Sequence, residues 1–174
     1  PGFSNPALEP EQSQTVEAGL KGANGPVRWE ATAFDTEVDD LIALDETFTP
    51  RNINEAEIQG VELAAEIAWR DWQADFNASV KDVEDAATGN QLPRRAEESL
   101  RASLTRNLGA WTIGADLRYE DTRFDRLDNA TELDSYTLLD LRAAWRFAPD
   151  WRASFKIDNA TDEDYQLTAI HNRD

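Results

Sequence analysis

The stretch "GAWTIGADLRYED", residues 109–121, alternates between apolar and polar side chains. Every second residue from its tryptophan is apolar, namely Trp111, Ile113, Ala115, Leu117 and Tyr119. None of the residues between them is large and apolar, and three are charged. Successive side chains of a β-strand point to opposite faces, so a period of two predicts a strand with one apolar and one wet face. The apolar face must lie against either a protein core or lipid.

The same alternation recurs along most of the chain. It is found in seven further segments, which are 16–20, 27–33, 61–69, 72–80, 100–104, 139–147 and 151–157. A shorter ninth strand is predicted over 38–44. The segment "AEESLRASL" (96–104) also fits helical spacing, but its neighbours favour a strand. The sequence therefore predicts an all-β chain of about eight or nine strands.

The connections between these segments alternate in length. Short turns are expected at 21–26, 70–71, 106–109 and 148–150, and long polar segments at roughly 35–58, 81–98, 120–137 and from 158 onward. This order predicts an antiparallel up-and-down meander with all short turns at one end and all long loops at the other. Outer-membrane β-barrels have this layout, with short periplasmic turns and long extracellular loops.

All six tryptophans fall in the apolar series and within a few residues of a short turn. They are Trp29, Trp69, Trp72, Trp111, Trp145 and Trp151. We expect them to form a belt at a membrane interface, because the tryptophan ring is apolar and its N–H needs a polar partner. The alternative is that they are core aromatics at the strand ends of a sandwich, although a soluble core would scatter them in depth.

The length of the apolar series also fits a membrane. Trp111 and Tyr119 are eight residues apart, or about 26 Å along a strand that rises about 3.3 Å per residue. A tilt near 40° reduces this to about 20 Å, close to the apolar band of roughly 25 Å in outer-membrane barrels. We therefore interpret the apolar face as lipid-facing and the polar face as the lining of a wet lumen.

Composition excludes several other classes of protein. The chain has 174 residues and a net charge of −18, which argues against a nucleic-acid partner because phosphate binding requires basic patches. It has no cysteine, which excludes disulfides and thiolate metal sites. No apolar run approaches the roughly 20 residues of a membrane-spanning helix. The chain has no methionine, so we interpret it as an internal piece of a longer protein.

Four segments, taken in order, resemble the C-terminal part of the barrel of TonB-dependent outer-membrane receptors. "NPALEPEQSQTVEAGLKG" (5–22) resembles the family's NPxLKPExS segment, which opens a strand, and "TAFDTEVDDLIAL" (32–44) resembles the strand that follows. "NINEAEIQGVELAAEI" (52–67) is the most specific match and is similar to N-x-x-x-A-x-I-x-G-V-E. "DNATDEDYQ" (158–166) resembles the N-L-x-D-x-x-Y segment near the end of the barrel.

Within the family, "LPRRAEESLRASL" (92–104) followed by "IGADLRYEDTRFD" (113–125) looks most like the cobalamin transporter branch. The resemblance implies a bacterial outer-membrane barrel of about 22 strands with an N-terminal plug domain. It also implies a transport protein and not an enzyme, which imports cobalamin or a ferric siderophore with energy from the TonB complex. Residues 1–174 are then expected to be a fragment of that barrel, without the plug domain and without the last strand, since the sequence stops at "AIHNRD" (169–174).

The resemblance places ligand contacts on the long loops. The basic and aromatic candidates there are Arg94, Arg95, Arg123, Arg126 and Tyr165. Arg94 and Arg95 can meet an anionic ligand or lipopolysaccharide, or be ordinary charges at a strand edge. The charged residues of the wet strand faces are expected to pair with one another and with the plug.

Acidic residues crowd the same long segments, at 82–85, 121–134 and 162–164. Clustered carboxylates can hold calcium, but the spacing of a DxDxDG loop is missing, so a solvated acidic rim is the better interpretation. His171 is the only histidine, and one histidine alone forms neither a metal cluster nor a catalytic triad. The sequence therefore predicts no metal site.

Two alternative hypotheses remain from the sequence. Eight strands suffice to close a small barrel of their own, with a structural or adhesive role. A soluble β-sandwich that acts as a binding module is the other alternative. The small barrel predicts a chain that ends in a strand, and the sandwich predicts neither the tryptophan belt nor the alternation of loop lengths.

Overall fold

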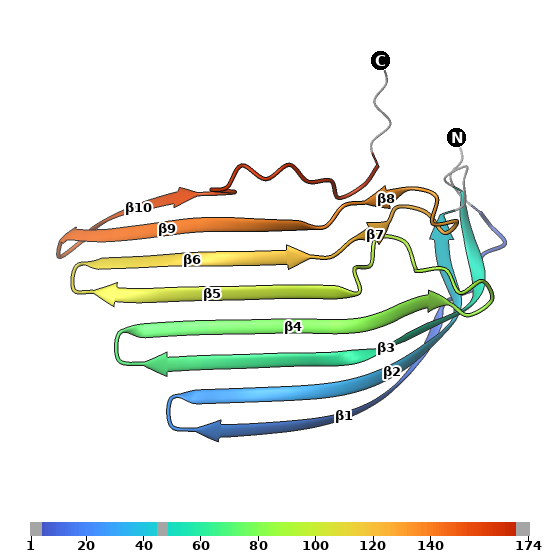
Figure 1. Ribbon diagram of the computed structural model, residues 1–174, viewed down its shortest axis with the longest axis horizontal. Helices are drawn as coiled ribbons and strands as arrows, with labels where there is room; N and C mark the ends of the chain where they lie inside the picture. Colours follow the sequence, from blue (N-terminus) through green and yellow to red (C-terminus); the bar gives the residue numbers. More distant parts are fainter. Residues whose placement is uncertain (1–4, 45–48, 170–174) are drawn as a thin grey trace, which may run out of the picture.

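The computed structural model describes residues 5–44 and 49–169, and its main feature is one antiparallel sheet of 8 strands (Figure 1). Its strands are β1 (Gln12–Asn24), β2 (Val27–Leu44), β3 (Pro50–Trp69), β4 (Trp72–Asp85), β5 (Glu98–Leu108), β6 (Trp111–Glu120), β9 (Tyr136–Ala148) and β10 (Trp151–Ile157). They pair in chain order, which confirms the predicted up-and-down meander. A separate hairpin pairs β7 (Arg123–Phe124) with β8 (Glu132–Leu133).

The sheet is open, because β1 and β10 form its two edges and do not pair with each other. A self-contained eight-stranded barrel and a two-sheet sandwich are therefore both wrong for this chain. No helix in the described part of the chain is long and apolar enough to cross a membrane. His171 and the rest of 170–174 lie outside the described residues, as does 45–48 within the predicted loop 35–58.

The short-turn ends of successive hairpins are staggered. Val27, at the start of β2, pairs with Ile67, and β3 runs on to Trp69. The β5–β6 and β9–β10 hairpins each extend past their neighbours in the same direction, so the turns step regularly across the sheet (Figure 1). A steady stagger of this kind is the shear that tilts the strands of a closed barrel. The sheet therefore has the geometry of one sector of a larger cylinder.

The strands are longer than predicted at the long-loop end. The segment 38–44 is the continuation of β2 and not a ninth strand, and much of the predicted loop 35–58 is the paired end of β2 and β3. The predicted loop 81–98 likewise contains the end of β4, and 120–137 contains β7 and β8.

A reversal of the sequence pattern explains why the sequence did not predict these extensions. From Val61 to Trp69 the outward positions of β3 are apolar. From Val61 toward the long-loop end they are Gln59, Glu57 and Glu55. The inward positions become apolar instead, and Ala56 is fully buried. The alternation persists with its two faces exchanged, so a search for an apolar outward face ends too early.

A small hydrophobic core lies at the long-loop end of the sheet. It contains Val38 and Leu41 of β2, Ala56 of β3, Val83 of β4 and Leu92 of the following loop. Leu92 is held by its N–H, which donates to the Val83 carbonyl at 2.8 Å. The apolar residues of the outward strand face remain exposed, by 72% at Leu20 and 59% at Phe155. The outward face therefore requires contact with an apolar surface outside the chain, whereas the loop end packs around its own hydrophobic core.

Candidate functional site

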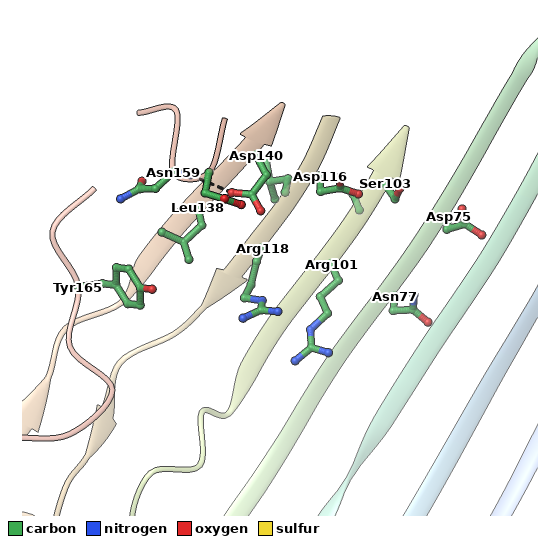
Figure 2. Close-up of a pocket in the computed structure, with 13 residues that line it drawn as sticks. Asp75, Asn77, Arg101, Ser103, Asp116, Arg118, Leu138, Asp140, Asn159 and Tyr165 are labelled. Carbon is green, nitrogen blue, oxygen red and sulfur yellow. Dashed lines mark hydrogen bonds between the residues drawn. The ribbon is translucent and has the colours of Figure 1, made fainter. Parts of the chain in front are cut away.

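The polar faces of β4, β5, β6 and β9 line a shallow cavity of about 430 Å3 on the lumen side (Figure 2). The labelled residues that line it are Asp75, Asn77, Arg101, Ser103, Asp116, Arg118, Leu138, Asp140, Asn159 and Tyr165. Because neighbouring positions on one strand face are two residues apart, the period that makes the outward face apolar gathers these charges on the inward face. The cavity therefore has a wall of mixed charge suited to a polar partner.

Arg101 and Arg118 lie directly opposite each other across β5 and β6, and their guanidinium groups point the same way in Figure 2. Like charges directly opposite each other destabilise a sheet. Glu120 offsets part of this charge, since its carboxylate lies 3.7 Å from the Arg101 guanidinium. The sequence analysis did not identify this pair, although the turn at Gly109 sets the register that places it. An acidic group from outside the chain would relieve the remaining repulsion.

Arg142 of β9 lies flat on the lumen wall and bridges three strands. Its guanidinium forms an ion pair with Asp116 of β6 and donates to the hydroxyls of Ser103 and Thr105 on β5, at 3.1 and 2.6 Å. Gly114 provides the space, because a Cβ at this position would lie 2.6 Å from the Arg142 Nε. The glycine thus lets an arginine cross over β6 and tie β9 to β5.

We expect Gly114→Val to destabilise the barrel by about 1–3 kcal/mol, because the added side chain displaces Arg142 from its partners. Urea titration of the purified protein in detergent micelles, followed by gel mobility of the folded form, measures this loss. The matched test is the same substitution in an Arg142→Ala background, where the displacement has already happened and the cost is expected to be small. An equal cost in both backgrounds would contradict this role of Gly114.

The loops at the other end of the sheet hold one another in place. Arg94, with a left-handed φ of 58°, donates through Nε to Asp125 at 2.7 Å, and the Asp125 side chain is 3% exposed. The Arg94 N–H donates to the Phe124 carbonyl at 2.7 Å, and Asn90 donates to the Leu127 carbonyl at 2.9 Å. The β4–β5 and β6–β9 loops are therefore joined by an ion pair to a buried carboxylate and by hydrogen bonds to backbone carbonyls.

Arg123 joins these loops to the segment after β10. It is buried, and its guanidinium donates to the carbonyls of Gln166 and, at 3.5 Å, Asp134. The same guanidinium lies 5.2 Å from the ring centroid of Tyr136, which packs 4.8 Å from the ring of Tyr165. We call residues 86–97, 121–135 and 158–169 the loop cluster, since these contacts make them one packed unit.

The five predicted ligand residues fall into separate parts of the loop cluster. Arg94 and Arg95 line a second cavity of about 340 Å3, whose apolar wall is formed by Leu41, Ile42, Ala43 and Pro93. Tyr165 lines the lumen cavity. Arg123 is buried within the cluster, and Arg126 is half-buried in the same loop. Asp125 was predicted to belong to a solvated acidic rim, but it is buried and holds Arg94. Tyr136, which packs against Arg123 and Tyr165, was not identified from the sequence.

Acidic side chains surround the base of the β4–β5 loop. The pKa of Glu97 is raised, first by partial burial and then by the negative charges of Asp82, Asp121 and Glu98. Within residues 5–44 and 49–169, no group of three or more His, Cys, Asp or Glu residues is arranged to hold a metal ion. The predicted acidic rim is not exposed throughout, because Asp85 and Asp125 of these segments are buried.

The six tryptophans lie on the apolar face of the sheet, near the staggered short turns. Trp69 pairs with Trp72 across one turn, and Trp111 pairs with Trp145 with their rings stacked 5.3 Å apart. Phe147 continues this row to Trp151, 6.2 Å away. Trp72 is half-buried, and the other five are at least 40% exposed.

A staggered antiparallel meander with an apolar outer face, a charged inner face and packed loops at one end defines a sector of a large outer-membrane β-barrel. The family described as "TonB dependent receptor-like, beta-barrel" matches residues 1–160. The chain belongs to this family, whose members lie in the outer membrane of Gram-negative bacteria. This confirms the resemblance found in the sequence.

Curated relatives include the vitamin B12 transporter BtuB of Photobacterium profundum, 31% identical over 99% of this chain and 30% of its own length. BtuB of Vibrio cholerae is 31% identical over 95% of this chain and 28% of its own. The chain thus spans less than a third of these relatives.

Solved structures of the same fold include the ferric yersiniabactin uptake receptor FyuA of Yersinia pestis, with a TM-score of 0.80, 22% identity and coverage of 91% of this chain and 26% of that one. The siderophore receptor PiuA of Acinetobacter baumannii has a TM-score of 0.78 and 23% identity, and covers 92% of this chain and 26% of its own. At these identities the likeness concerns the fold.

Proposed function

We propose that residues 1–174 form one sector of the barrel of an outer-membrane import receptor that is energised through TonB. The observation that carries this proposal is the open, staggered sheet with an apolar outer face and a charged inner face. Such a sector needs further strands at both edges and a polar body against its lumen face. The neighbouring strands and an N-terminal plug domain are the partners that fit these surfaces, and lipid fits the outer one.

The lumen wall supports the proposed plug contact. Arg101 and Arg118 point into the lumen as an opposed pair, while Asp75, Asp116 and Asp140 line the same cavity. A plug that presents a carboxylate to the two arginines would relieve their repulsion. Such a contact would also position the plug against β5 and β6.

We propose that the ligand is cobalamin or a ferric siderophore and that the protein transports it without chemical change, so that it is not an enzyme. The curated relatives named above are vitamin B12 transporters, and the solved structures of the same fold include a ferric yersiniabactin uptake receptor and a siderophore receptor. Arg94, Arg95, Arg126 and Tyr165 are the proposed contacts. Arg95 and the ion pair of Arg94 with Asp125 form a charged edge beside an apolar wall, an arrangement suited to a large ligand with polar and apolar parts.

Uptake measured in the bacterium that makes the receptor tests this proposal. We expect deletion of its gene to abolish high-affinity uptake of either radiolabelled cyanocobalamin or a radiolabelled ferric siderophore, and complementation to restore it. Deletion of TonB is expected to have the same effect while leaving ligand binding to the cell surface intact. Unchanged uptake of both ligands, or uptake that does not depend on TonB, would contradict the proposal.

A further inference from the structure

A basic and aromatic patch lies on the outward face of β3, β4 and β5, beside two short turns. We call it the Trp–Arg patch and define it as Trp69, Arg70, Trp72 and Arg106. Trp69 pairs with Trp72, and Trp72 pairs with Arg106, so these three side chains leave the sheet on the same face. The guanidinium carbon of Arg106 lies 4.7 Å from the Trp72 ring centroid, and that of Arg70 lies 4.7 Å from the Trp69 ring centroid.

Arg106 occupies a position that the strand pattern assigns to lipid. Its neighbours on the same strand face, Leu104 and Leu108, are apolar and more than 40% exposed. An arginine on the lipid face of a barrel is costly at the bilayer centre and nearly free at the interface, where its head reaches the polar layer. Because Arg106 is level with Trp72 near the short-turn end, its guanidinium lies at the height of the headgroups.

The hydrogen-bond donors of Arg106 are not satisfied from within the sheet. Its Nε is shielded from solvent and has no hydrogen-bond partner among the described residues. The ion pairs within the described part of the chain involve other basic residues and neither Arg70 nor Arg106. Two guanidinium groups in a chain with a net charge of −18 thus face outward beside tryptophan rings. A ligand with acceptor oxygens complements them.

Phosphate is the group that this arrangement fits. A guanidinium binds two phosphate oxygens at once through parallel N–H donors, and a tryptophan ring beneath it holds its plane in place. The surface next to the patch is apolar, with Ile67 on β3 and Ala74 and Phe76 on β4. A ligand with a phosphate head and acyl chains therefore matches both parts of this surface.

We propose that the Trp–Arg patch binds the phosphate of a glycerophospholipid in the periplasmic leaflet of the outer membrane. Arg106 and Arg70 bind the phosphate oxygens, the two tryptophans flank the glycerol and ester groups, and one acyl chain lies along Ile67 and Phe76. The leaflet follows from the short turns, which face the periplasm in barrels of this kind. Lipid A also carries phosphates and acyl chains, but it occupies the opposite leaflet.

Native mass spectrometry of the full-length receptor, purified from the bacterium, tests this site. The delipidated protein is titrated with palmitoyl-oleoyl phosphatidylglycerol, with the matching phosphatidylethanolamine, with the matching diacylglycerol and with lipid A. We expect both phospholipids to bind and diacylglycerol to bind at least about tenfold more weakly, because it lacks the phosphate. The variant Arg70→Gln/Arg106→Gln is expected to lose a similar factor for both phospholipids.

Arg152→Gln is the matched control, because Arg152 follows Trp151 at the same end of the sheet but faces the lumen. It is expected to bind phospholipid as the wild type does, and gel mobility with and without heating verifies that each variant folds. Wild-type phospholipid affinity in the double variant, or equal binding of diacylglycerol, overturns the proposal. Binding of lipid A in preference to both phospholipids overturns it as well, since the surface would then belong to the other leaflet.

Discussion

The substitution Ala65→Arg is expected to reduce strongly the amount of receptor that accumulates as a folded barrel, whereas Ala64→Arg is expected to be tolerated. Ala65 lies on the apolar face of β3 between Trp29 and Phe76, four residues from Trp69. That position is close to the middle of the apolar band, where an arginine costs about 2–4 kcal/mol. A barrel has a net stability of the order of 5–15 kcal/mol, so this is a large share of it.

Ala64 makes a stringent control because the residue, the substitution and the strand are all matched and only the face differs. Ala64 lies between Glu30 and Asn77 on the wet face of the sheet, where an added arginine remains hydrated. Outer-membrane fractions of cells that carry each variant would be separated on gels with and without boiling. Equal amounts of the heat-shifted band for both variants would contradict the assignment of the outer face to lipid.

The second large effect is expected at Arg123, whose side chain joins 121–135 to 158–169 within the loop cluster. Its replacement by alanine removes charge-assisted hydrogen bonds to two carbonyls and a ring contact with Tyr136, together about 3 kcal/mol of local stability. Because 1.4 kcal/mol is a factor of ten, local opening of the cluster is expected to become roughly 100-fold more frequent. Amide hydrogen exchange of 121–135 and 158–169 is expected to accelerate accordingly, while β5 and β6 remain protected.

Two variants separate this role from a general effect of charge. Arg123→Lys keeps the positive charge but cannot bind both carbonyls in one plane, so it is expected to lose most of the protection. Arg118→Ala removes an exposed arginine of the lumen wall and is expected to leave exchange in the cluster unchanged. Wild-type exchange in Arg123→Ala would show that the segments are held by other contacts.

The membrane-facing part of the fold could be predicted from sequence because lipid imposes a strict pattern. Every outward position from Trp111 to Tyr119 has to be apolar, so one strand already reveals the period and the face. The outward positions of β3 no longer have to be apolar on the long-loop side of Val61. Beyond it, Glu57 points outward and Ala56 inward, and the same alternation resembles a polar loop. The strand ends therefore required the structure.

The loop cluster was less accessible to sequence reasoning, because its contacts join residues far apart in the chain. Arg123 was identified as a candidate for ligand contact, but its side chain reaches Gln166, 43 positions away, and is buried. No local pattern links these two residues. The opposed pair of Arg101 and Arg118 could have been found, since the turn at Gly109 pairs Leu108 with Trp111 and fixes every pair further along the hairpin.

A small core stabilises the extracellular end of the sheet separately from the lipid-facing part. It is formed by Val38, Leu41, Ala56, Val83 and Leu92. The outward face of the sheet is stabilised by contact with lipid, but this core is stabilised by the exclusion of water, as is the interior of a soluble domain, and urea weakens that effect. The two ends of one strand are therefore expected to melt under different conditions. Urea is therefore expected to loosen the loop end of the sheet first, while the lipid-facing strands remain paired.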